Sequence, residues 1–246
     1  MAGCDLALGR LMAIAVSVRE VLATSGGFPV LAGANLEVAA GEAVVLRGPN
    51  GAGKTSLLRL CAGLLSPVRG SCEVLGVDVG DRRRFPHRRI GMLAHDNHLY
   101  GDLSLGANIA FSIRASGRRG ALPRAVAESL GLSQELLSVP ARRCSAGQRR
   151  RAGLAMLLVR DPDLWLLDEP YASLDSSARA TLDGILQDQL RRGATLVVAS
   201  HDDGVEARLG ARTISMAGGR VLDQVELDKS HAARFDILEA GNGTLG

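Results

Sequence analysis

One glycine-rich segment constrains the fold of this chain more than any other feature. Residues 48–55 fit the pattern G-x-x-x-x-G-K-[ST]; a strand-like apolar run precedes them, and helical spacing follows at 55–65. In this context successive backbone N–H groups point at one anion, and the helix adds its positive dipole end. The segment predicts a triphosphate-binding loop that consists of Gly48, Pro49, Asn50, Gly51, Ala52, Gly53, Lys54, Thr55 and Ser56.

Two residues of this loop have separate expected roles. We expect Lys54 to bridge the β and γ phosphates of the triphosphate as a point charge, and the Thr55 hydroxyl to coordinate Mg²⁺. Lys54 and the metal would then both neutralise charge that develops on the phosphates. The alternative is a glycine-rich turn followed by a surface lysine, which the flanking strand and helix disfavour.

A second candidate site lies where an apolar run ends in two acids. Residues 164–167 are followed by Asp168, Glu169 and Pro170. Buried carboxylates are costly unless they face a cation or a reacting water. We therefore expect Asp168 to lie near the metal and Glu169 to act as the base for the attacking water; a purely structural acid pair is the alternative.

The short apolar runs predict an α/β core. Residues 164–167 and 195–199 are bounded by Pro, Asp or His, as expected for buried parallel strands separated by helices. The alternation at 14–18 predicts a first strand rather than part of a secretory signal.

The segment before the glycine-rich loop resembles a strand pair. Strand-like runs at 35–38 and 43–46 flank the turn 39–42, which contains Gly41. This pattern predicts a hairpin that leads into the phosphate-binding loop.

A helical insertion is expected in the middle of the chain. Residues 102–144 lack strand-like runs, and helix-like segments at 106–115 and 123–130 are separated by a glycine-containing stretch at 116–120. The expected divisions are a single ATP-binding domain at 12–223, a helical subdomain within it at about 96–158, and a C-terminal tail at 224–246.

Composition limits the class of protein. With 46% apolar and 22% charged residues, the 246-residue chain is expected to be globular, and a net charge of +3 is too balanced to imply nucleic acid. The arginine runs at 82–84, 88–89 and 149–151 lack interleaved aromatic residues, so we interpret most of them as solvated faces.

The four cysteines form no C-x-x-C pair, so the sequence predicts neither a metal site nor disulfides and fits a protein of the reducing cytosol. No apolar stretch reaches the roughly 18 to 20 residues that cross a bilayer.

Three further segments complete an ordered set of motifs. Residues 145–148 (Ser-Ala-Gly-Gln) precede the acid pair, residues 173–175 (Ser-Leu-Asp) follow it, and His201 follows the run 195–199. Together with the phosphate-binding loop, this order resembles the ABC ATPase family over nearly the whole chain. The resemblance implies a P-loop NTPase (RecA-like) α/β core with an antiparallel β subdomain and an inserted helical subdomain.

The resemblance also implies a mechanism, with ATP as substrate and Mg²⁺ as cofactor. The implied catalytic residues are Glu169, His201 and Lys54. The implied signature, which acts on the nucleotide of a second copy in a homodimer, consists of Ser145, Ala146, Gly147 and Gln148. Ser145 is also of a type that caps helices. Integral membrane transporter subunits are the implied partners, which would place the chain peripherally at the cytoplasmic face of the inner (plasma) membrane.

Two positions depart from the family pattern. Where the family usually has Gln in the loop that joins the core to the helical subdomain, this chain has His95. We expect His95 to be a third metal contact beside Thr55 and Asp168, with an ordinary loop residue as the alternative. Where the family stacks an aromatic ring on adenine, only Phe28 is available, and it is expected either to stack or to pack in the core.

The loop after His95 and residues 145–150 resemble the ATPase subunits of the haem exporters used in cytochrome c maturation. ATPase subunits of other bacterial exporters, for drugs, lipids or polysaccharides, remain an alternative, as does a non-transport ABC protein. A nucleotide-binding module without turnover would lack the base, whereas Glu169 is present.

Overall fold

The strands form two sheets that share a hydrophobic core. The computed structural model describes residues 13–94, 99–117 and 122–222. Within these residues the first sheet is antiparallel, with four strands in the order β2-β1-β4-β5. Its strands are β1 (Ile14–Ser25), β2 (Phe28–Ala39), β4 (Arg69–Val74) and β5 (Val77–Asp78).

The second sheet is mainly parallel. In the described residues it has six strands in the order β10-β9-β3-β8-β7-β6, and β10 pairs antiparallel with β9 while the other pairs are parallel. Every residue of β7 and β8 is buried, as expected for parallel strands covered on both faces. The strands are β3 (Ala43–Arg47), β6 (Ile90–Leu93), β7 (Leu164–Asp168), β8 (Thr195–Ala199), β9 (Arg212–Ala217) and β10 (Arg220–Leu222).

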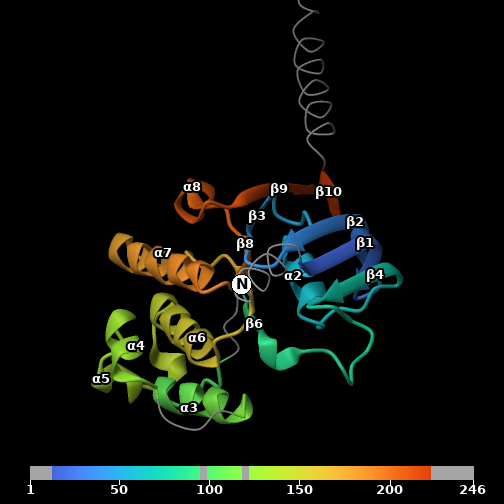
Figure 1. Cartoon of the computed structure of the whole chain (residues 1–246). Coiled ribbons are helices and arrows are strands. Elements are labelled where there is room, and N and C mark those ends of the chain that lie inside the picture. The colour runs from blue at the N-terminus through green and yellow to red at the C-terminus, as the bar shows by residue number, and fades with distance from the viewer. Residues whose placement is uncertain (1–12, 95–98, 118–121, 223–246) are drawn as a thin grey trace, which may run out of the picture.

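Helices cover both faces of the parallel sheet. Helix α2 (Lys54–Cys61) contacts β4 of one sheet and β7 of the other. Figure 1 shows α3 to α6 gathered at the lower left, on the side away from the antiparallel sheet. The remaining helices are η1 (His87–Arg89), α3 (Leu105–Ala115), α4 (Arg124–Ser129), α5 (Gln134–Leu137), η2 (Ala141–Arg143), α6 (Ala146–Arg160), α7 (Ser176–Arg191) and α8 (Val205–Leu209).

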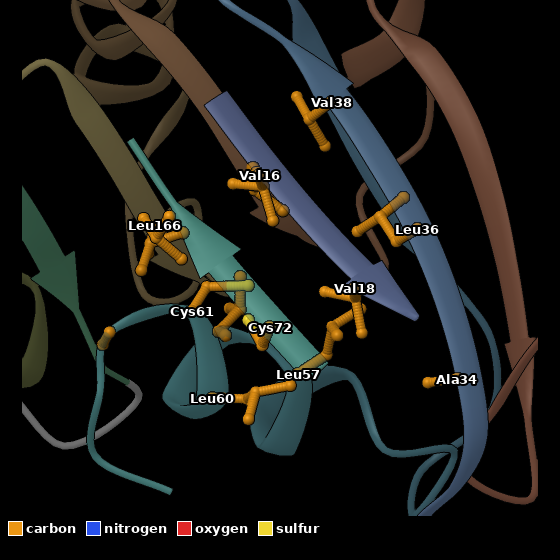
Figure 2. Packing of buried hydrophobic residues seen from close by; sticks show 14 of the residues in the cluster. Val16, Val18, Ala34, Leu36, Val38, Leu57, Leu60, Cys61, Cys72 and Leu166 are labelled. Atoms are coloured by element: carbon orange, nitrogen blue, oxygen red, sulfur yellow. The ribbon is translucent and has the colours of Figure 1, made fainter. Parts of the chain in front are cut away.

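Neighbouring side chains of the parallel strands point into two different cores. In β7, Leu164 and Leu166 pack with α2 and the antiparallel sheet, whereas Trp165 and Leu167 pack with the helices on the other face. This alternation follows from the period of two in an extended strand. Figure 2 shows Leu166 in the first core, with Cys61 of α2 and other residues of the two sheets around it.

The structure confirms the predicted combination of an α/β core, an antiparallel sheet and helices inserted between β6 and β7. The predicted strands at 14–18, 164–167 and 195–199 lie within β1, β7 and β8. The tail at 224–246 lies outside the described residues.

The predicted hairpin of 35–38 with 43–46 is wrong. Both runs are strands, but β2 pairs with β1, and β3 pairs with β8 and β9 in the other sheet. The turn at 39–42 therefore carries the chain from one sheet to the other. The physical reason is that residues 43–46 are all buried and need cover on both faces, which a central position in the parallel sheet provides.

Cys61, Cys72 and Cys144 are buried free thiols, and Cys4 lies outside the described residues. No helix in the described part of the chain combines the length and the apolar character needed to cross a membrane.

Replacement of Leu166 tests the first core. Leu166 is fully buried, so Leu166→Ala removes packed methyl groups and leaves a cavity. We expect a loss of about 2–5 kcal/mol in the free energy of unfolding, measured by urea denaturation. Leu64→Ala is the control, because Leu64 is 70% exposed and its truncation should change stability by less than about 0.5 kcal/mol. Equal effects of the two substitutions would contradict this core.

Candidate functional site

The glycine-rich loop runs from the end of β3 to the first residue of α2, and two of its glycines have no acceptable replacement. Gly48 has φ 146°, and a Cβ atom there would lie 2.1 Å from the carbonyl oxygen of Met216. Gly53 has φ 100°, and its Cβ would lie 2.9 Å from the Val30 carbonyl oxygen. Both positions therefore require a residue without a side chain.

Lys54 folds back over this loop. Its side chain is largely buried, and Nζ donates to the carbonyl oxygens of Gly48 at 2.7 Å and Pro49 at 3.1 Å. Burial lowers the pKa of the Lys54 ammonium from its ordinary value, while the carboxylates of Glu169 and Asp168 oppose that shift. The loop thus holds a partly desolvated cation against two backbone carbonyl dipoles.

Thr55 and Asp168 meet although they are far apart in the sequence. The Thr55 hydroxyl donates to Asp168 Oδ2 at 2.8 Å, and Asp168 is only 3% exposed at the end of β7. A hydroxyl and a carboxylate are oxygen ligands of the kind Mg²⁺ prefers, and Mg²⁺ commonly takes its other ligands from phosphates and water. Among the described residues, no group of three or more His, Cys, Asp or Glu is arranged to hold a metal. The donor set of these two residues therefore fits a magnesium ion.

Glu169 and His201 lie beside each other at the same edge of the sheet. Glu169 has φ 48°, and its backbone N–H donates to the Ala199 carbonyl at 2.8 Å. Its Oε2 accepts a hydrogen bond from the His201 backbone N–H at 3.2 Å, and Oε1 lies 3.7 Å from His201 Nε2. The same His201 Nε2 lies 3.2 Å from Lys54 Nζ, so a carboxyl group, an imidazole and an amino group converge.

These residues line one cleft of about 570 Å³. Its size suits a nucleotide-sized ligand, since small-molecule sites typically have about 300–1,000 Å³. The lining residues are Pro29, Val30, Asn50, Gly51, Ala52, Gly53, Lys54, Thr55, Ser56, Asp168, Glu169 and His201. Pro29 and Val30 were not predicted from the sequence as site residues, because their apolar side chains belong to no catalytic or phosphate-binding motif.

Phe28 is not a core residue. Its side chain is 75% exposed at the start of β2, next to the two residues that line the cleft from that strand. The alternative that packs Phe28 in the core is therefore wrong, and stacking on adenine stays a prediction. His95, the predicted third metal contact, lies outside the described residues.

Residues 145–148 begin helix α6. Ser145 is the N-cap: its hydroxyl accepts from the Gln148 backbone N–H at 3.2 Å, and the Gln148 side chain accepts from the Ser145 N–H at 2.8 Å. This reciprocal pair fixes the first turn of the helix. These four residues lie within the described range 122–222, and they do not line the cleft that contains Lys54.

Arg150 is a buried exception among the arginine runs. It is 3% exposed, and its Nη1 donates to the Ala94 carbonyl at 2.8 Å. The sequence did contain a signal: residues 150, 153, 154 and 157 share one helical face, and that face of α6 is buried. Arg150 thus joins the helical region to the end of β6.

Replacement of Gly48 tests the geometry of the loop. In Gly48→Ala the new methyl group would collide with the Met216 carbonyl, so we expect a loss of at least about 1–3 kcal/mol in stability and a large loss of ATP affinity. Gly184→Ala is the matched control, because its Cβ meets no atom within 4 Å on helix α7, and it should be neutral or stabilising. Thermal denaturation and equilibrium ATP binding measure both effects; normal ATP binding by Gly48→Ala would contradict the loop geometry.

Comparison with known proteins agrees with this site. The family described as ABC transporter matches residues 31–172. The chain is 38% identical over 188 residues to the cytochrome c biogenesis ATP-binding export protein CcmA of Roseobacter denitrificans, covering 76% of this chain and 84% of that protein. It is 36% identical over 216 residues to the Fe(3+) ions import ATP-binding protein FbpC 2 of Rhodococcus jostii, covering 85% of this chain and 62% of that protein.

Among solved structures, the dimeric post-hydrolysis state of the ATP-binding cassette MJ0796, bound to ADP and Pi, superimposes with a TM-score of 0.75. Its sequence is 25% identical, and the alignment covers 85% of this chain and 97% of that one. With a family match over more than half of its length and a fold shared with a solved cassette, this chain belongs to the ABC transporter family of ATP-binding proteins.

Proposed function

We propose that the chain is the ATP-hydrolysing subunit of a transporter, works as a homodimer and drives separate integral membrane subunits. The observation that carries this proposal is the convergence of Lys54, Thr55, Asp168, Glu169 and His201 on one cleft. Membership of the ABC transporter family supports ATP as the substrate.

In this proposal residues 48–56 hold the phosphates of ATP. The backbone N–H groups of the loop and the N-terminus of α2 attract the negative charge. Lys54 exchanges its two carbonyl partners for phosphate oxygens, so that the cation already placed in the loop meets the β and γ phosphates. Thr55 and Asp168 would hold Mg²⁺, which supplies charge neutralisation on those phosphates.

Glu169 is the proposed general base. Its carboxylate lies at the edge of the cleft and is held by the His201 backbone N–H, so it can take the proton of a water that attacks the γ phosphate. His201 is proposed to orient the γ phosphate and that water through its ring, which already lies close to Lys54. The two residues act together because each fixes the position of the other.

The signature residues Ser145, Ala146, Gly147 and Gln148 are proposed to bind the nucleotide of a second copy. They begin a 15-residue helix whose N-terminus attracts anions, yet they do not line the cleft of their own chain. A symmetric dimer resolves this separation, because each copy then completes the site of the other. The dimeric state of the solved cassette bound to ADP and Pi supports this arrangement.

The membrane partners are proposed to bind the helical region between β6 and β7, with the chain at the cytoplasmic face of the membrane. The proposed ATP-binding domain spans 12–223, with the helical subdomain at about 96–158. His95 is proposed to contact the metal or the attacking water from the loop that joins this subdomain to the core.

The cargo is proposed to be haem, exported for cytochrome c biogenesis. The similarity to CcmA of Roseobacter denitrificans over 84% of that protein's length supports this narrower function. A second candidate is uptake of a metal ion, because FbpC 2 of Rhodococcus jostii has nearly the same identity. The nucleotide site is common to both and does not separate them.

Capture of the membrane partners distinguishes the two cargoes. We expect the chain, tagged and purified from detergent-solubilised membranes, to bring down integral membrane proteins of cytochrome c assembly, identified by mass spectrometry. Recovery of an iron permease instead would replace the haem proposal. The same pull-down from the soluble fraction is the control for nonspecific capture.

Replacement of Glu169 tests hydrolysis. In Glu169→Gln the water loses its base while the phosphate contacts remain, so we expect ATP turnover to fall by at least about 100-fold with ATP affinity retained. ATP-bound dimers should then accumulate with ATP and Mg²⁺, as measured by size-exclusion chromatography with light scattering. Glu128→Gln, which changes an exposed acid of α4, is the matched control and should keep normal turnover. Wild-type turnover in Glu169→Gln would refute the proposed base.

A further inference from the structure

A cluster of polar and charged side chains includes Asp202, the residue after His201, and none of its members has a role in the proposed chemistry. Its members come from four segments of the chain: the end of β3, the loop after Glu169 with helix α7, the loop after β8, and helix α8. The members are Arg47, Tyr171, Arg179, Asp183, Asp202, Glu206 and Arg208.

Arg179 makes two contacts with two different loops. Its Nη1 forms an ion pair and hydrogen bond with Asp202, which directly follows His201. Its Nε donates to the carbonyl oxygen of Leu174 at 3.0 Å. One guanidinium therefore joins the loop that carries His201 to the loop that follows Glu169.

Asp202 is held from several sides. Arg47 Nη2 donates to its carbonyl oxygen at 2.6 Å, and its backbone N–H donates to Ser200 Oγ at 3.0 Å. A second cation, Arg208, lies 3.9 Å from Oδ1. Any shift of Asp202 away from Arg179 would move the neighbouring His201, because the two residues share a peptide bond.

The other loop reaches the first turn of α6. The Ser173 carbonyl oxygen lies so close to Gly147 that a Cβ atom on Gly147 would be 2.5 Å from it. Asp175 then caps α7 by accepting from the Ala178 N–H at 2.8 Å. Leu174, whose carbonyl oxygen accepts from Arg179, lies between Ser173 and Asp175 in the sequence.

We propose that Arg179 is a positioning residue that fixes His201 through Asp202 and ties it to the loop packed on the signature segment. The inference rests on the proposed function, because it assumes that His201 and Glu169 serve hydrolysis. The chemistry requires arginine: two N–H groups of one rigid plane reach two acceptors at once, which a single ammonium on a flexible stem does not reproduce.

A purely structural role gives a different expectation. The side chain of Arg179 is 39% exposed, and partly exposed ion pairs contribute little to stability, about 0–1 kcal/mol. Displacement of a catalytic group by about 1 Å can cost up to roughly 100-fold in rate. Turnover, rather than folding or nucleotide affinity, should therefore respond to changes of Arg179.

The experiment measures kcat, ATP affinity and Tm for Arg179→Gln, Arg179→Lys and Asp202→Asn in the full chain. We expect kcat to fall about tenfold or more in all three, with ATP affinity within about twofold of the unaltered chain. The double variant Arg179→Gln/Asp202→Asn should lose no more than Arg179→Gln alone, because removal of the Asp202 carboxylate adds nothing once its Arg179 partner is gone. Arg191→Gln is the matched control: it breaks the Arg191–Asp188 ion pair at the far end of the same helix and should keep normal kcat.

The outcomes separate this inference from the proposed function. The inference would be overturned if Arg179→Gln and Asp202→Asn had a kcat within twofold of that of Arg191→Gln. It would also be overturned if ATP affinity fell as much as kcat. A third contrary result is a double variant in which the two losses of kcat multiply. Glu169→Gln is measured beside them. If it loses turnover while Arg179→Gln does not, only the positioning role fails; if Glu169→Gln keeps turnover, the proposed function fails.

Discussion

The arrangement of the site depends on one edge of the parallel sheet. Strands β3, β7 and β8 run in the same direction, and their registers bring Leu46 and Asp168 level with Ala199. The residues that follow these strands therefore emerge at one place: the glycine-rich loop, Glu169 and His201. The carboxyl edge of parallel strands is where α/β proteins generally bind ligands, because the loops there can vary while the strands stay buried. The Thr55–Asp168 hydrogen bond closes this edge by joining the start of α2 to the end of β7.

Burial then determines the electrostatics of that edge. Asp168 and Lys54 are both nearly enclosed, and each is hydrogen-bonded by uncharged groups: Asp168 by the Thr55 hydroxyl, and Lys54 by two carbonyl oxygens. Interactions of such groups with a ligand are stronger than in water, because the surrounding dielectric is low. The same burial makes the site intolerant of an unpaired charge.

The features predicted correctly from the sequence are mostly those that a short segment determines by itself. The phosphate-binding loop, the strand that ends in Asp168, and the cap at Ser145 are each encoded within a few residues, and the structure has all three elements. The hairpin at 35–46 was predicted wrongly because the choice between two sheets depends on distant strands. The burial of Arg150 and the Arg179–Asp202 pair were missed for the same reason: their partners lie on other segments, and the identity of a residue does not state its partner.

The alternation of side chains along β7 and β8 has a mechanical consequence. Leu166 and Leu167 are covalent neighbours, yet one packs against the phosphate-binding helix and the other against the helices of the opposite face. The sheet is thus a common wall between two close-packed compartments, and a small displacement of a strand backbone changes the packing on both sides at once. A volume change in one compartment is then felt by the other, so the stability effects of substitutions on the two sides of this wall should not simply add.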